Sequence, residues 1–131
     1  MCRIILKVGR KTCTQGMRNE LKRLTVLNRR RFFRFVLIFK ILNNLDCPEQ
    51  LLGIFIFRRS VRSRELRDET LLDLPKVKTR MGQTMFAYAG ANDWNSPVPV
   101  HIRQLRTIAI FKQTLFKNLL DCGDHNHVCS L

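Results

Sequence analysis

Acidic residues are scarce in this 131-residue sequence, which has 10 aspartates and glutamates against 24 lysines and arginines. No two aspartates are adjacent, so the carboxylate clusters that hold two divalent ions in many metal-dependent active sites are missing. The sequence also has no phosphate-binding P-loop, no glycine-rich dinucleotide loop and no HExxH zinc motif. We therefore expect a protein that is not an enzyme, has no catalytic residues and needs no cofactor.

The five cysteines are an odd number without regular spacing, which argues against a disulfide framework and favours reduced thiols. Two of them belong to a short C-terminal cluster that is a weak candidate for a zinc site, formed by Cys122, His125, His127 and Cys129. The short intervals between these residues leave little chain to surround a tetrahedral ion. A disordered, solvated tail at residues 122–131 is therefore the interpretation we favour.

Long hydrophobic runs are also missing. The N-terminal Ile4-Ile5-Leu6 is too short for the core of a signal peptide. The most hydrophobic stretch, Phe32 to Leu45, contains Arg34 and Lys40 and is shorter than the roughly 20 apolar residues of a membrane-spanning helix. It predicts a buried helix, and we expect an intracellular protein, nuclear or cytoplasmic, that is not secreted and has no membrane partner.

Positive charge is present in excess, and it is concentrated in the first half of the chain. Residues 1–67 hold 17 lysines and arginines against 4 acidic residues, whereas residues 68–131 hold 7 against 6. This asymmetry is typical of a polyanion-binding part joined to a neutral packing part, although a solvated basic surface is the alternative. The side chains expected to contact RNA or DNA phosphates are Arg29, Arg30, Arg31, Arg34, Arg58, Arg59, Arg62, Arg64 and Arg67.

Hydrophobic spacing predicts a mainly α fold, with one small helical domain at residues 17–121 after an irregular basic N-terminus at residues 1–16. Apolar residues recur at helical spacing through residues 17–27. They recur again in a last helix after Thr107, with a stripe of Ile108, Phe111, Leu115 and Leu119. Residues 101–105 suit a short helix, and residues 58–82 read as a long basic loop.

Two shorter segments carry local signals. Asp46, Pro48 and Glu49 resemble a capping box at the start of a short helix. Near residues 85–90, large and small side chains alternate, which predicts a short extended aromatic segment that ends at Gly90. The only tryptophan, Trp94, follows this segment, and we predict that it is packed in the core.

Two stretches of the chain occur in the order and spacing of one known family. The first is Phe39-Lys40-Ile41-Leu42-Asn43-Asn44-Leu45, followed by Cys47, Pro48 and Leu51. The second comprises Thr79, Arg80, Gly82, Phe86, Ala87, Gly90, Trp94, Asn95, Ser96, Pro99, Ile102, Arg103, Phe111, Lys112 and Leu115. Together they resemble the region that follows the catalytic domain in reverse transcriptases of LINE-type (non-LTR) retrotransposons, and the likeness covers about residues 21–120.

The resemblance implies a detached C-terminal segment of such a polymerase, without the catalytic palm, that supports the holding of template RNA or target DNA. In the parent element its partner would be the polymerase core. Two alternatives remain open: a free-standing basic helical protein that binds nucleic acid or an acidic protein, and a translated relic of a transposable element without function. Pro97 and Val98 separate Ser96 from Pro99, where the family usually has one residue, and this difference is consistent with the relic.

Overall fold

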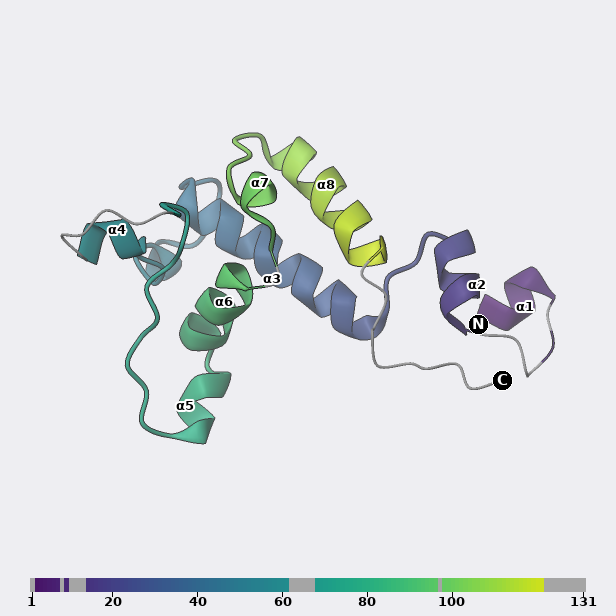
Figure 1. Ribbon diagram of the computed structural model, residues 1–131, viewed down its shortest axis with the longest axis horizontal. Coiled ribbons are helices and arrows are strands. Elements are labelled where there is room, and N and C mark those ends of the chain that lie inside the picture. Colours follow the sequence, from purple (N-terminus) through teal and green to yellow (C-terminus); the bar gives the residue numbers. More distant parts are fainter. Residues whose placement is uncertain (1, 8, 10–13, 62–67, 97, 122–131) are drawn as a thin grey trace.

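The computed structural model describes residues 2–7, 9, 14–61, 68–96 and 98–121, and these residues form a mainly α-helical fold, as predicted. Within these ranges there is no β-strand, only an isolated antiparallel bridge between Phe57 and Leu72. Figure 1 shows most helices gathered around the long helix α3 (Val26–Leu42). Two short helices, α1 (Cys2–Leu6) and α2 (Thr14–Glu20), lie beyond its N-terminal end.

Helix α3 supplies the base of the core. The Thr25 hydroxyl accepts a hydrogen bond of 3.1 Å from the backbone N–H of Asn28, which caps the start of the helix. Phe35, Ile38 and Phe39 recur at helical spacing and are buried. The buried helix predicted within Phe32 to Leu45 is therefore confirmed, although it begins six residues earlier, at Val26.

Helix α8 (Ile108–Asp121) packs along α3. Near one end of the pair, the rings of Phe39 and Phe111 stack with their centroids 4.3 Å apart. Near the other, the Asn28 amide donates a hydrogen bond of 2.9 Å to the Leu119 carbonyl oxygen. Phe111, Leu115 and Leu119 are buried, so the predicted stripe of this last helix is confirmed.

Helix α6 (Phe86–Asn95) contributes Trp94, whose side chain is 2% exposed. The Trp94 ring is edge-on to Phe35 of α3 and stacked near Phe111 of α8, with centroid distances of 6.4 and 6.0 Å. The predicted core position of Trp94 is confirmed, because its ring contacts both longer helices. The short helix expected around residues 101–105 is confirmed as α7 (Val100–Arg103), which follows α6 and precedes α8 in the sequence. Its Ile102 side chain is buried.

The predicted extended aromatic segment near residues 85–90 is wrong, because α6 begins at Phe86. Four alternating side chains are too few to distinguish a strand from one turn of a helix, and packing decides between them. Gly90 lies inside α6, where it is buried rather than terminating the segment. A Cβ atom there would lie 3.0 Å from Cζ of Phe55 and 3.3 Å from Cδ1 of Ile38, so glycine allows this close packing.

The N-terminal region also differs from expectation. Helix α2 ends at Glu20 and Lys22 has a φ of 48°, so the helix predicted through residues 17–27 is interrupted before the Thr25 cap starts α3. Met17 of α2 is buried, as its place on the apolar stripe suggests. Residues 1–16 were expected to be irregular, yet they include α1 and the start of α2.

The stretch at residues 58–82 is not one continuous loop in the part that the structure describes. It includes α4 (Arg58–Val61) and the start of α5 (Arg80–Thr84). Backbone hydrogen bonds of 2.8 Å join Arg58 N–H to the Leu71 carbonyl and Asp73 N–H to the Ile56 carbonyl. These bonds join the start of the stretch to its middle and satisfy backbone groups there, so residues near 71–73 are held against residues 56–58.

The short 3-10 helix η1 (Glu49–Leu51) follows Pro48 without a side-chain cap, so the predicted capping box is not formed. Asp46 instead has a φ of 34° and its side chain is fully exposed, 3.8 Å from Lys40 Nζ. Gly53 follows η1 in the sequence and has a φ of 82°.

Among the described helices, none combines the length and hydropathy needed to cross a membrane.

Candidate nucleic-acid interface

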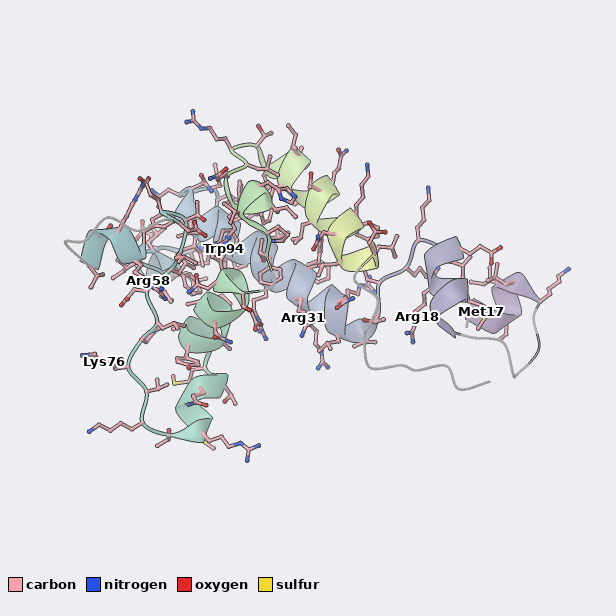
Figure 2. The ribbon with its side chains drawn as sticks, in the orientation of Figure 1. Met17, Arg18, Arg31, Arg58, Lys76 and Trp94 are labelled. Atoms are coloured by element: carbon pink, nitrogen blue, oxygen red, sulfur yellow. The ribbon has the colours of Figure 1, made fainter. Side chains whose placement is uncertain are left out.

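The arginines predicted to contact phosphates do not form one cluster. Arg29 and Arg30 are exposed and Arg31 is partly exposed, all in the first two turns of α3. Arg58 lies well away from Arg31, beyond the opposite end of α3 (Figure 2). Arg62, Arg64 and Arg67 are outside the described residues, as is the tail with Cys122, His125, His127 and Cys129.

Two of the described arginines already have structural roles, and a third, Arg58, is partly buried. Arg34 forms an ion pair with Asp93, which joins α3 to α6. Arg59 pairs with Glu69 at 3.2 Å and its guanidinium lies 5.2 Å from the centre of the Phe57 ring. Arg58 is partly buried, and its Nε atom has no hydrogen-bond partner in the part of the chain described. These side chains are less available to phosphate than those at the start of α3.

A hollow lies beside the start of α3, with a volume of about 580 Å³. A second hollow of about 490 Å³ adjoins it, since Phe32 and Phe116 line both. We call the two together the basic groove, which is lined by Arg18, Lys22, Arg23, Leu24, Arg29, Phe32, Phe33, Lys112, Gln113, Phe116 and Lys117. No acidic side chain is among these lining residues.

The positive charge of the basic groove is not neutralised within the described chain. The ion pairs formed there use Arg34, Lys40, Arg59 and Arg103, and none of these residues lines the groove. Six lysines and arginines therefore face the groove region without a carboxylate partner among the described residues. Cations gathered in a concave surface raise the local positive potential and attract polyanions.

Three aromatic rings, those of Phe32, Phe33 and Phe116, line the basic groove. Phe32 is partly buried and meets Phe116 of α8 edge-on, with centroids 6.0 Å apart and planes at 90°. Phe33 is edge-on to Phe32 at 5.6 Å, yet it remains 60% exposed. Helix α3 thus places the Phe32 ring against Phe116 of α8 and leaves the Phe33 ring open to a ligand.

Sequence reasoning found only Arg29 among the cations of the groove. It did not assign Lys22, Arg23, Lys112 or Lys117 to a site. Their meeting at one groove depends on the packing of α8 on α3 and on the turn that follows α2. One signal was present: two phenylalanines directly follow the triple arginine, in a stretch where aromatics and cations interleave.

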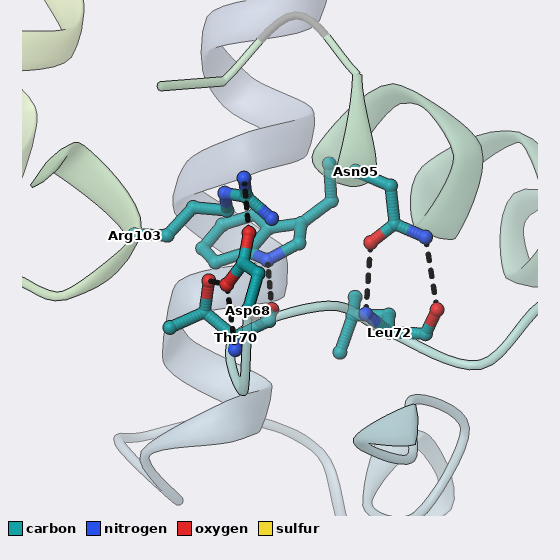
Figure 3. A network of polar contacts seen from close by, with 6 residues as sticks. Asp68, Thr70, Leu72, Asn95 and Arg103 are labelled. Carbon is teal, nitrogen blue, oxygen red and sulfur yellow. Dashed lines mark hydrogen bonds and ion pairs between the residues drawn. The ribbon is translucent and has the colours of Figure 1, made fainter. Parts of the chain in front are cut away.

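The residues that carry the family resemblance around Trp94 form a polar network around residues 68–72 (Figure 3). The Trp94 indole N–H donates to the Thr70 carbonyl oxygen at 3.2 Å. The Asn95 amide both donates to and accepts from the backbone of Leu72, with each hydrogen bond 2.8 Å long. Arg103 forms an ion pair of 2.9 Å with Asp68. Trp94, Asn95 and Arg103 thereby hold the chain segment at residues 68–72 in place.

In the described residues, no three histidine, cysteine or acidic side chains are placed to hold a metal ion together. Comparison of the chain with protein-family models, with curated proteins and with solved structures found no match.

Proposed function

We propose that this chain is a detached C-terminal accessory segment of a non-LTR retrotransposon reverse transcriptase, which binds RNA or DNA through phosphate contacts and does not catalyse a reaction. One observation supports binding above all: the cations of the basic groove have no acidic lining residue beside them. The resemblance described above supports the assignment to the parent element. The Trp94, Asn95 and Arg103 contacts fit it, since they give those residues a role in a folded scaffold.

Phosphate binding follows from the charge and exposure of α3. Arg29, Arg30 and Arg31 occupy successive positions, so they spread over more than half of the helix circumference near its N-terminal end. Each lysine or arginine that neutralises a phosphate releases condensed counterions, which makes the affinity fall as salt rises. These contacts give affinity without sequence preference, because phosphates carry no information on the bases.

The test is a salt series with labelled RNA and DNA oligomers, measured by fluorescence anisotropy. The variant Arg29→Gln/Arg30→Gln/Arg31→Gln removes three charges at the start of α3. Its matched control, Lys76→Gln/Lys78→Gln/Arg80→Gln, removes three exposed charges elsewhere on the molecule, and Figure 2 shows Lys76 well separated from Arg31. Both variants lower the net charge by the same amount. A difference in affinity or salt slope between them therefore shows that the location of the charges matters.

We expect the α3 variant to reduce the slope of log affinity against log salt by roughly 2 for single strands, if all three side chains contact phosphates. The control should keep the slope closer to that of the wild type. Equal losses in both variants would indicate a diffuse charge effect without an interface. An affinity that does not depend on salt would contradict the proposed function itself.

A further inference from the structure

The basic groove has a feature that phosphate binding does not require, which is an exposed aromatic ring among its cations. We propose that the groove binds single-stranded RNA or DNA, with an unpaired base stacked on Phe33 and the flanking phosphates held by Arg18, Lys22, Arg23 and Arg29. This inference rests on the proposed function, and it names the form of nucleic acid that the groove takes.

The placement of Phe33 is the first argument. Phe33 is 60% exposed, lines the groove together with several cations, and has the ring of Phe32 5.6 Å away. Arg29 lies one helical turn before Phe33, so a cation and a ring share one face of α3. When a base stacks on the Phe33 ring, the phosphate on its 5′ or 3′ side lies near the guanidinium of Arg29.

The shape of the groove is the second argument. It continues from the α2 side past Phe32 and Phe116 to Lys112 and Lys117 of α8, so its cations are distributed over both hollows. A flexible single strand can follow such a path and turn its bases inward. Single-strand binding sites commonly combine a positively charged groove with aromatic rings that stack on successive bases.

A duplex fits this groove less well, because its bases are already stacked on one another and their faces are closed to Phe33. An acidic polypeptide would use the cations, but its carboxylate side chains have no aromatic face to stack on the ring. The aromatic contact therefore distinguishes a single strand from both. Stacking is also tolerant of sequence, because every base has a π-face.

The experiment compares three probes of equal length with the wild-type chain: an oligothymidylate, an abasic oligomer with the same phosphates, and a duplex. We expect the oligothymidylate to bind most tightly at a fixed salt concentration. Phe33→Ala should weaken its binding by about tenfold, within the roughly 5- to 150-fold range of one stacked base. The same variant should leave the abasic oligomer, the duplex and the salt slope unchanged.

Two further variants separate stacking from apolar contact and from misfolding. Phe33→Leu keeps an apolar side chain without a ring and should lose affinity as Phe33→Ala does. Phe33→Trp keeps the ring and should retain binding, and the introduced indole should be quenched by the oligothymidylate but not by the abasic oligomer. Far-ultraviolet circular dichroism of all three variants should match the wild type, since Phe33 is mostly exposed.

The outcomes separate the two proposals. If no polyanion binds the wild type, the proposed function falls and this inference falls with it. If binding is salt-dependent but the abasic oligomer binds as tightly as the oligothymidylate, or Phe33→Ala has no effect, only the stacking site is overturned. Tighter binding of the duplex, or equal competition by an acidic polypeptide, would also overturn it.

Discussion

Arg103 and Asp68 form an ion pair of 2.9 Å in which the arginine side chain is only 5% exposed and the aspartate 19% exposed. The pair joins α7 to the chain that leads to Thr70, next to the Trp94 hydrogen bond (Figure 3). The Nε and Nη1 atoms of Arg103 are buried without a hydrogen-bond partner in the part that the structure describes. Asp68 is therefore the group that compensates the buried guanidinium, and its loss should be costly.

Replacing Asp68 tests this relationship. Asp68→Asn should lower the free energy of unfolding by about 3 kcal/mol, near the low end for a broken buried pair because Asp68 keeps some exposure. The matched control is Glu69→Gln, which breaks the adjacent but exposed pair with Arg59 and should cost about 0–1 kcal/mol. Urea unfolding monitored by circular dichroism measures both, and equal losses would contradict the role of Asp68.

The same carboxylate predicts a pH dependence of stability. Burial opposes ionisation of Asp68, but hydrogen bonds from Thr70 and the charge of Arg103 outweigh it and lower the pKa of Asp68. Because the folded-state pKa lies below the unfolded value of about 3.9, this stabilisation is fully present at higher pH and is lost as pH falls through the folded pKa. The stability difference between wild type and Asp68→Asn should therefore be constant above about pH 5 and shrink in acid.

Truncating Trp94 should strongly destabilise the fold. Trp94→Ala removes a ring that contacts both α3 and α8, at an expected cost of about 3–5 kcal/mol. Thermal melting checks this, with Ile110→Ala as a control because Ile110 is an aliphatic side chain of α8 that is 51% exposed. An unchanged melting temperature in Trp94→Ala would show that Trp94 is not part of the core.

Two helical glycines should respond in opposite directions to alanine. Gly90→Ala places a Cβ against Phe55 and Ile38 and should destabilise by about 1–3 kcal/mol despite the better helix propensity of alanine. Gly16→Ala in α2 meets no atom within 4 Å and should stabilise by up to about 1 kcal/mol. Urea unfolding midpoints of the two variants give the comparison, and a stabilising Gly90→Ala would refute the tight contact with Phe55.

The absence of paired aspartates predicts that the purified chain has no polymerase activity. Primer extension on an RNA template with Mg²⁺ or Mn²⁺ should give no incorporation above a buffer control. Adding the separate polymerase region of a related element is the informative second arm. Activity of the chain alone would contradict the prediction, whereas a change only in the mixed reaction would support an accessory role.

Much of the helical core was predictable because its signal is local and repeated. The stripe of Phe111, Leu115 and Leu119 spans several turns, and such a periodic pattern suits one buried helix face. The run that begins at Phe32 similarly predicted a buried helix. Trp94 was predictable as a core residue because a large aromatic side chain gains most from burial.

The errors lie where the local signal was short. Alternation over Phe86 to Ala89 suited a strand or a helical turn, and the structure has a helix there in which Gly90 packs closely against Phe55. At Lys22 a positive φ broke a stripe that continued in the sequence. At both positions the observed backbone conformation goes with an interaction outside the short sequence pattern, the packing of Gly90 in one case and the Thr25 cap in the other.

The arginines show the same division between sequence and tertiary structure. The sequence by itself determined that the first half of the chain is basic and that a triple arginine, Arg29 to Arg31, directly precedes a hydrophobic run. Only the tertiary structure decided that Arg34 is paired with Asp93, and that Phe33 and Lys112 belong to one groove. Helical periodicity is encoded by neighbouring residues, whereas ion pairs and grooves depend on which distant segments pack together, and a single sequence does not display that pairing.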